Sequence, residues 1–204
     1  MELPYMKAAC ARQRWSKAAN YVRLLALQRE GGLYFDTDIE VLKPFDPLLS
    51  ERCFIGFQGR KEHAHWVNNA VLGAEPGHPF LAACMDLTLS LFEQEGALCA
   101  SPVIVTRVLK DWGLVHYGHQ TIRDVTLFLC EYFYPYRWTD TLTPERLTTE
   151  TYCIHHWARW RRQRWRRWQQ RFKNRWQDLL RTTVALKDSV KSSAFRFDGS
   201  GPKA

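Results

Sequence analysis

Asp36 and Asp38 are the residues of this sequence whose type and spacing most clearly suggest chemistry. They follow a short apolar run at 33–35, and side chains two apart in an extended chain point the same way. Both carboxylates would then face one side and Thr37 the other. Two carboxylates held close together repel each other unless a bound cation offsets their charge. Their hard oxygen atoms suit Mg²⁺ or Mn²⁺ and fill only part of the ion's coordination shell. We therefore expect the ion to bind a diphosphate as well.

An Asp-x-Asp triplet alone is a weak signal, because such triplets arise by chance and often lie in solvated loops. The context strengthens the signal here. Residues 18–30 have helical spacing, and Gly31 and Gly32 stop the helix because glycine adopts the left-handed conformation without strain. Residues 33–35 then predict a strand. The acid pair therefore follows a strand end, which is where open α/β sheets bind ligands.

The elements that must position this pair are predicted from apolar periodicity and from glycine and proline positions. Strands are expected at 53–57, 68–74 and 125–129, helices near 6–15, at 79–94 and at 101–112, a short turn at 47–49 and a polar loop at 59–65.

A last apolar stretch ends at His155. A histidine at such a place is commonly structural, but an imidazole beside an acid pair can also bind a metal or a diphosphate oxygen.

Three stretches resemble the sugar-nucleotide-binding region of glycosyltransferase family 32. Residues 18–24 read Ala-Ala-Asn-Tyr-Val-Arg-Leu, residues 31–38 read Gly-Gly-Leu-Tyr-Phe-Asp-Thr-Asp, and residues 42–44 read Leu-Lys-Pro. The resemblance implies an α/β, Rossmann-like fold of the GT-A type, which binds nucleotide-diphospho-sugars. It covers residues 3 to about 160 and lacks the family's opening strand–helix–strand portion, so we expect an N-terminally incomplete fold.

The resemblance also implies roles for the acid pair and the histidine. Asp38 is expected to be the first metal ligand, and His155 a second ligand on the diphosphate side, because the family closes its site with a His-x-Trp or His-His-Trp segment. Asp36 is expected to contact the ribose and sugar hydroxyls of the donor. Asp36 and Asp38 are therefore the expected catalytic residues, and Mn²⁺ or Mg²⁺ is the expected cofactor.

Three more residues are expected to bind the donor. Asn20 stands where the family usually has an aspartate that contacts the donor sugar, and an amide lacks charge-assisted hydrogen-bond strength. Arg23 would bind the donor or hold the carboxylates, unless it forms only an ion pair on the helix surface. Asn69 belongs to an Asn-Asn-Ala passage that the family places near the sugar. The alternative is that Asn68 and Asn69 only cap or pair at a strand edge.

The function implied is a metal-dependent glycosyltransferase that moves a sugar from a nucleotide-diphosphate donor to a saccharide or lipid-linked acceptor. The resemblance implies retention of configuration and a place in bacterial polysaccharide or lipopolysaccharide synthesis. No nucleophile stands out, so a covalent intermediate stays open. The alternative is an inactive transferase-like remnant that binds a membrane or a partner. Asn20 and the missing opening portion favour this alternative, whereas the intact acid pair and His155 favour the enzyme.

Composition fits one globular domain with a reduced interior. The chain has 204 residues with 46% apolar and 14% aromatic content, and no apolar run is long enough to cross a membrane or to act as a secretory signal. Six scattered cysteines favour reduced core thiols over a disulfide framework. The net charge of +8 comes from the segment 157–176, which holds nine Lys or Arg and no acid, so the rest of the chain is at −1.

The expected organisation has three parts. Residues 1–156 form the partial transferase domain, 157–187 a basic amphipathic helix rich in Trp and Arg, and 188–204 a disordered tail. The helix could bind an anionic membrane surface through 157–176, pack on the catalytic domain, or bind nucleic acid. Membrane binding is the favoured alternative, and nucleic-acid binding is the least favoured. We therefore expect a cytoplasmic protein, peripheral at the inner face of the membrane.

Overall fold

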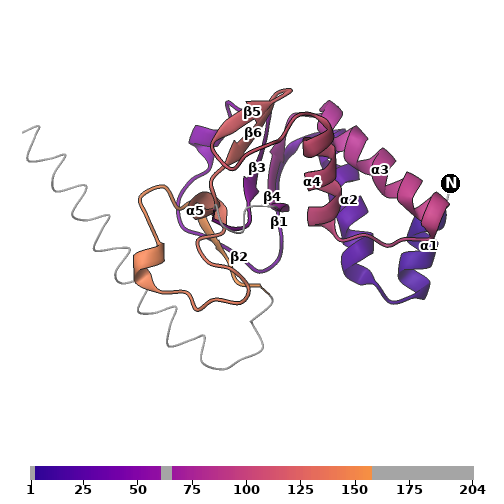
Figure 1. The fold of residues 1–204 in the computed structure, drawn as a ribbon, viewed down its shortest axis with the longest axis horizontal. Coiled ribbons are helices and arrows are strands. Elements are labelled where there is room, and N and C mark those ends of the chain that lie inside the picture. The colour runs from indigo at the N-terminus through magenta and orange to yellow at the C-terminus, as the bar shows by residue number, and fades with distance from the viewer. Residues whose placement is uncertain (1–2, 61–65, 158–204) are drawn as a thin grey trace, which may run out of the picture. The chain divides into compact units, whose positions relative to one another are not determined.

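A computed structural model describes residues 3–60 and 66–157 of the chain, all of which belong to the first of its two compact units, Met1–Ala158. Strands β1, β3, β4 and β6 lie side by side, with helices α1 to α4 grouped to one side of them (Figure 1). The described elements are α1 (Pro4–Ala11), α2 (Trp15–Glu30), β1 (Gly32–Phe35), β2 (Ile39–Val41), η1 (Asp46–Leu48), β3 (Cys53–Phe57), β4 (Val67–Ala74), α3 (Pro79–Glu95), α4 (Ser101–Asp111), β5 (Gln120–Ile122), β6 (Val125–Phe128), α5 (Cys130–Phe133), η3 (Pro144–Arg146) and β7 (Cys153–His155).

The central sheet has five strands in the order β1-β4-β3-β6-β5, and β2 and β7 form a separate two-stranded sheet. Only the β3–β6 pair of the described sheets is parallel, and the other pairs are antiparallel. Helices and a mixed sheet that contains a parallel pair confirm the predicted α/β fold class. The strand that carries the acid pair, β1, lies at one edge of the sheet.

Each face of the sheet buries its own apolar layer, because successive side chains of a strand point to opposite faces. Along β3, Cys53, Ile55 and Phe57 belong to the layer that includes side chains of α2, α3 and α4. Phe54 points the other way, into an aromatic layer. That second layer consists of Phe45, Leu48, Phe54, Ala70, Val71, Phe128, Phe133, Tyr134, Tyr152 and Cys153. The aromatic layer includes Cys153 of β7 and packs against Ile39 of β2, so it supports the β2–β7 sheet.

The sequence placed most long elements correctly, but the first helix was wrong. A helix near 6–15 was expected, whereas α1 ends at Ala11 and α2 begins at Trp15. Gln13 between them has a φ of 54°, a left-handed conformation that a continuous helix cannot contain. The short strands β2 and β5 were not predicted, because three residues are too few to show alternation.

Gly73 marks a point in the sheet where no side chain fits. A Cβ atom added there would lie 2.1 Å from Cε1 of Phe54, whose ring is 1% exposed. We expect Gly73→Ala to lower the free energy of unfolding by about 3 kcal/mol, because the overpacked ring must leave its rotamer or the strands must separate. Urea denaturation measures this loss.

The matched experiment for Gly73 is the double variant Gly73→Ala with Phe54→Leu. The smaller side chain removes the ring atoms that the new methyl group would meet, so the two losses should be less than additive by 1 kcal/mol or more, roughly. Additive losses would mean that Gly73 is needed for a reason other than contact with Phe54.

The predicted basic helix at 157–187, the tail at 188–204 and part of the loop at 59–65 lie outside the described residues, with one exception. Trp157, the first residue of the predicted helix, is a turn residue with a φ of 52°, and its indole Nε1 donates to the carbonyl of Tyr136 at 3.0 Å. It therefore packs on the first compact unit, and the helix prediction was wrong at this residue. Among the helices described, none is long and apolar enough to cross a membrane.

Candidate functional site

Gly31 sets the direction in which the chain leaves α2 and enters β1. Its φ is 66°, and its backbone N–H donates to the carbonyl of Leu27 at 2.8 Å, which closes the helix. A Cβ atom at this position would lie 2.6 Å from Cδ of Pro76. Both the left-handed conformation and the close approach require glycine. The prediction that the double glycine stops the helix directly before a strand is confirmed.

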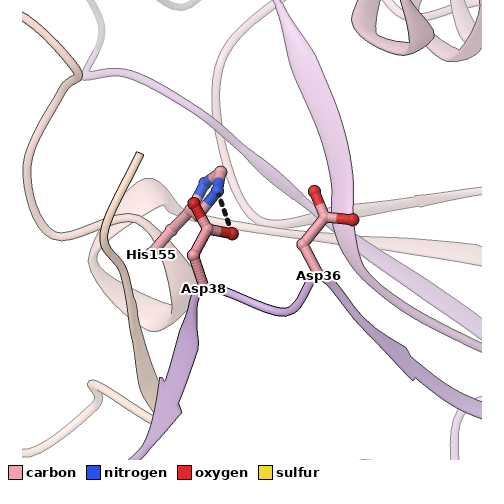
Figure 2. Close-up of side chains that lie close together, drawn as sticks. All are labelled: Asp36, Asp38 and His155. Atoms are coloured by element: carbon pink, nitrogen blue, oxygen red, sulfur yellow. Dashed lines mark ion pairs between the residues drawn. The ribbon is translucent and has the colours of Figure 1, made fainter. Parts of the chain in front are cut away.

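Asp36 and Asp38 lie in a tight turn between β1 and β2. The extended conformation expected for 36–38 was wrong: β1 ends at Phe35, and the N–H of Ile39 donates to the carbonyl of Asp36 at 3.0 Å. The N–H of Asp36 donates to the carbonyl of Ala70 at 2.8 Å, which fixes the start of the turn to β4. The turn still brings the two carboxylates toward one place, as Figure 2 shows.

The β2–β7 sheet brings His155 to the acid pair from the far end of the domain. Ile39 pairs with His155 in this sheet, so the imidazole lies beside Asp38, and its Nε2 is 3.1 Å from the Oδ1 atom of Asp38 (Figure 2). The adjacent His156 donates its backbone N–H to the carbonyl of Asp38 at 2.9 Å. Its ring Nε2 lies 2.9 Å from Oε2 of Glu40. Two backbone and two side-chain contacts thus hold β7 against the turn.

Arg23 holds Asp36 from the opposite side. Its Nη2 atom lies 2.9 Å from Oδ1 of Asp36, and its guanidinium carbon lies 4.4 Å from the centre of the Tyr34 ring. The hydroxyl of Tyr34 donates to the same carboxylate oxygen at 2.8 Å. The arginine is 7% exposed, so the alternative of an ion pair on the helix surface is wrong. Because both donors use Oδ1, the second oxygen of Asp36 is directed elsewhere.

The phenol of Tyr34 stays protonated and therefore remains a donor to Asp36. Burial is the main cause that raises its pKa, to about 12, although the charge of Arg23 acts to lower it. Tyr34 was not identified from the sequence as a partner of Asp36, although its spacing from Asp36 indicates that role. Residues 34 and 36 are two apart along a chain that enters the turn from a strand, so their side chains share a side.

Asn69 lies inside the domain and supports Arg23. Its side chain is fully buried, and its backbone and side-chain oxygen atoms accept hydrogen bonds from Nη1 of Arg23 at 3.0 and 3.3 Å. Its Oδ1 also accepts from the hydroxyl of Ser101, the first residue of α4. Among the described residues, the amide nitrogen of Asn69 has no hydrogen-bond partner. Since β4 lies between β1 and β3, the strand-edge alternative for this pair of asparagines is wrong.

Asn20 lies on α2, three residues before Arg23 and hence on a neighbouring part of the helix surface. It is half-buried, and it makes no side-chain hydrogen bond or ion pair with the rest of the chain that the structure describes. The structure thus places Asn20 near the Arg23 end of the site without joining it to the acid pair.

The three ligand atoms of Asp36, Asp38 and His155 fit one divalent cation. These atoms lie within 4.8 Å of one another. Neighbouring and opposite ligands of an octahedral ion with bonds of about 2.1 Å are roughly 3.0 and 4.2 Å apart, so small side-chain movements suffice. Two carboxylates and one imidazole are donors that Mn²⁺ and Mg²⁺ accept. Meanwhile the guanidinium of Arg23 lies 2.9 Å from Asp36, which offsets part of the repulsion between the carboxylates.

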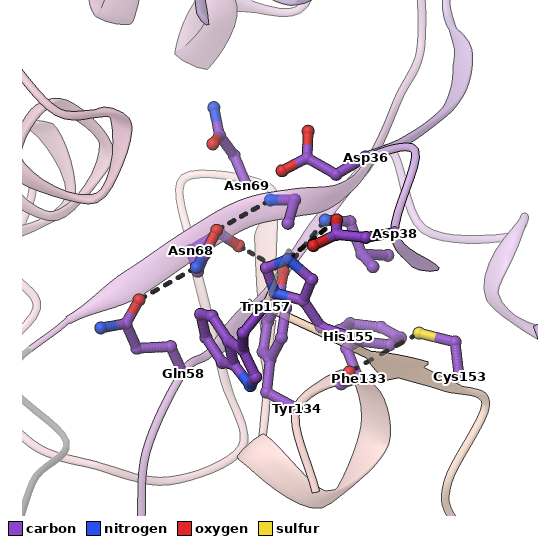
Figure 3. A network of polar contacts seen from close by, with 12 residues as sticks. Asp36, Asp38, Gln58, Asn68, Asn69, Phe133, Tyr134, Cys153, His155 and Trp157 are labelled. Atoms are coloured by element: carbon purple, nitrogen blue, oxygen red, sulfur yellow. Dashed lines mark hydrogen bonds and ion pairs between the residues drawn. The ribbon is translucent and has the colours of Figure 1, made fainter. Parts of the chain in front are cut away.

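An aromatic wall lies behind His155 (Figure 3). The Trp157 ring centre is 4.1 Å from the imidazole centre, and the Tyr134 ring centre is 5.8 Å from it. The hydroxyl of Tyr134 donates to the carbonyl of Asn68 at 2.9 Å, and the amide of Asn68 donates to Gln58 at 2.9 Å. Burial raises the pKa of Tyr134 well above its ordinary value, so its phenol remains neutral.

Comparison with known proteins gives two family matches. Residues 4–55 match the family described as "Glycosyltransferase sugar-binding region containing DXD motif", and residues 73–171 match the "Alpha 1,4-glycosyltransferase conserved region". The first match contains the acid pair and the second contains the histidine. A weaker structural likeness, with a TM-score of 0.41 and 22% identity over 52% of this chain and 38% of the other, is to the "PaToxG Glycosyltransferase".

Several curated relatives are glycosyltransferases by name. The chain is 31% identical over 165 residues to the lactosylceramide 4-alpha-galactosyltransferase of Mus musculus, which covers 73% of this chain and 44% of that protein. It is 25% identical over 130 residues to the alpha-1,4-N-acetylglucosaminyltransferase of Homo sapiens, which covers 63% of this chain and 36% of that protein. The chain thus spans less than half the length of either relative.

Proposed function

We propose, from the premise that this chain belongs to the family 32 glycosyltransferases with a DXD-motif sugar-binding region, that it transfers a sugar from a nucleotide-diphosphate donor to a saccharide or lipid-linked acceptor. The observation that carries the proposal is the convergence of Asp36, Asp38 and His155 from the two ends of the domain. Carboxylates at a strand end, with one oxygen of Asp36 already bound by Arg23, suit a hydroxylated, phosphate-bearing donor.

Asp38 and His155 are proposed to be the metal ligands, with Mn²⁺ or Mg²⁺ as the ion. When bound, such an ion supplies Lewis-acid stabilisation of the charge that develops on the leaving diphosphate. Asp38 is 9% exposed, and His155 is fixed in orientation by its contact with Asp38 and by the adjacent ring of Trp157. The protein thus holds its two ligands in place before a donor arrives, which reduces the entropic cost of binding.

Asp36 is proposed to bind the ribose and sugar hydroxyls of the donor. Arg23 and Tyr34 orient its carboxylate through Oδ1, so the remaining oxygen can accept from a hydroxyl group. Asn69 is buried too deeply to meet a donor in this conformation, and we propose that it acts by positioning Arg23. Asn20, half-buried on the same helix as Arg23, is proposed to meet the donor sugar.

The acceptor and the place of action are further proposals. The mouse relative is named for its action on lactosylceramide, a glycolipid, which supports a lipid-linked saccharide acceptor here. The basic segment 157–176, with nine Lys or Arg and five Trp, would keep the protein at an anionic membrane surface where such acceptors lie. We retain the proposals of retention at the anomeric carbon and of a peripheral membrane location.

The test of the proposed function is a donor panel with the full chain. Uridine and guanosine diphosphate sugars are incubated with Mn²⁺ and with simple saccharide acceptors, and donor loss and product anomer are followed by NMR. We expect hydrolysis or transfer with one donor, retention in any product, and loss of activity on chelation. A folded chain that binds none of the donors by calorimetry would instead support the transferase-like remnant.

A further inference from the structure

A cavity of about 200 Å³ lies beside the candidate metal site and has no role in the proposed donor chemistry. Its walls combine cationic and aromatic side chains. They consist of Gly59, Arg60, Cys130, Tyr134, Pro135, Tyr136, Arg137, Asp140 and Arg146. None of these residues was singled out as a binding residue from the sequence, because they come from two loops, α5 and η3, which only the fold brings together.

The cavity and the metal site share an aromatic wall. Tyr134 lines the cavity, and its ring centre is also 5.8 Å from that of His155. Trp157, whose ring centre is 4.1 Å from that of His155, donates to the carbonyl of Tyr136, another lining residue. Figure 3 shows Tyr134 and Trp157 directly beside His155. The cavity and the candidate metal site are therefore neighbours, and Tyr134 contacts both.

The lining of the cavity is positively charged. Asp140 is the one acid among the lining residues, and Nη1 of Arg146 donates to its Oδ2 at 2.7 Å. Burial acts to raise the pKa of Asp140, but hydrogen bonds from Thr139 and Arg146 lower it overall, so the carboxylate is ionised at neutral pH. Two arginine charges then remain in the lining, and neither Arg60 nor Arg137 has an acidic partner within the described part of the chain.

The thiol in the wall adds no negative charge. Burial raises the pKa of Cys130 to about 11, so the thiol is protonated at neutral pH. Glu131, which accepts from this thiol at 3.5 Å, is not a lining residue, and counting it would still leave a net positive charge.

The chemistry of the lining points to an anionic group on a small ring. Arginine presents a planar fork of donors that matches a carboxylate or a phosphate. At about 30 Å³ for each water, the cavity holds roughly seven waters, which is less than a usual ligand pocket but enough for one charged sugar residue. The neighbouring rings of Tyr134 and Tyr136 offer apolar walls for the faces of such a sugar.

We propose that this cavity is an acceptor subsite for a saccharide that carries a carboxylate or phosphate group, with Arg60 and Arg137 as the residues that recognise the anion. The assignment rests on the proposed function, because the neighbouring donor site is what makes a bound saccharide an acceptor. It gives a role to two arginines that line one cavity beside the candidate metal site.

The test measures sugar binding to the full chain and to Arg60→Gln, Arg137→Gln and the double variant. Glucuronic acid, glucose 6-phosphate and glucose are the probes, and backbone NMR shifts of Gly59 and Tyr136 locate them. We expect both charged sugars to bind at least tenfold more tightly than glucose, and each substitution to weaken that binding about tenfold, because a hydrogen bond to a charged group is lost. Arg29→Gln, an exposed arginine at the end of α2, is the matched control and should change nothing.

The outcomes show which anionic group is recognised and whether the subsite exists. Loss for only one charged sugar identifies the carboxylate or the phosphate as the recognised group. Equal binding of charged and neutral sugars, an equal loss in Arg29→Gln, or binding of inorganic phosphate without any preference among sugars (an adventitious ion only) would overturn the subsite.

Donor binding with Mn²⁺ is measured in the same samples and should not respond to the arginine substitutions. If the charged sugars bind as expected but no chain binds a donor, the proposed function fails, and the acceptor role fails with it. If donor binding is intact but the sugars ignore Arg60 and Arg137, only the subsite fails.

Discussion

Asp38→Asn should lower the Mn²⁺-dependent affinity for a nucleotide-sugar donor at least 100-fold, roughly, because one anionic ligand is lost and an amide oxygen coordinates weakly. The fold should survive. An asparagine Oδ1 can still accept the contact that Asp38 now makes with Nε2 of His155 at 3.1 Å. Calorimetry with Mn²⁺ and donor, and urea denaturation without them, therefore measure two separate effects of one substitution.

The control for Asp38 is Asp111→Asn, the same chemical change at an exposed position at the end of α4. It should leave both the donor affinity and the free energy of unfolding unchanged, since exposed substitutions away from special features cost little. Unchanged Mn²⁺-dependent donor binding in Asp38→Asn would remove Asp38 as a metal ligand. A large loss of stability in the same variant would show that Asp38 is structural.

Arg23→Gln should produce the largest loss of stability among the site residues, about 3 kcal/mol in the free energy of unfolding. Removing one partner of a buried ion pair leaves an uncompensated charge and costs about 3–5 kcal/mol. We take the low end because Asp36 is 27% exposed and water can replace part of the lost contact. The same change should weaken donor binding, because the carboxylate of Asp36 loses its Nη2 partner.

Two comparisons make the Arg23 result specific. Arg29→Gln lies on the same helix with an exposed side chain, and it should cost less than about 0.5 kcal/mol. Arg23→Lys keeps the charge but not the fork that reaches both Asp36 and Asn69, so its loss should be intermediate. Equal stabilities for the Arg23→Gln and Arg29→Gln proteins would mean that the buried pair contributes nothing to folding.

The features of this fold that could be predicted are those set by residues close together in the sequence. The bounds of β3 were predicted from a run of five apolar residues, and the end of α2 was predicted from Gly31, where a left-handed residue is required. The proximity of Asp36 and Asp38 was also expected, although through an extended chain rather than the turn that the structure contains. Such features depend on neighbours in sequence, so one sequence contains enough information.

The unpredicted part depends on contacts between distant residues. A contact of Arg23 with the carboxylates was one expectation, but its burial was not predicted, because a charged residue on an amphipathic helix resembles a solvated face. The oxygen atoms of Asn69 and Asp36 and the ring of Tyr34 compensate for that burial. Trp157 begins a run of Trp and Arg that favours an amphipathic helix, yet its ring lies against His155, with the ring centres 4.1 Å apart. The two-residue turn at Arg123 and Asp124, both with positive φ, joins β5 to β6 without a glycine signal.

The pairing of β2 with β7 makes the candidate metal site depend on residues from both ends of the described domain rather than on a local motif. His156 contacts Glu40, which is 116 positions earlier, so a ribosome must complete nearly the entire domain before the third ligand can reach the other two. The two-stranded sheet that joins them is only three residue pairs long, and it is separate from the five-stranded sheet. A cation bound by the β1–β2 turn and by β7 would stabilise the pairing of β2 with β7. Amide hydrogen exchange in β7 would then slow in proportion to the cation's occupancy.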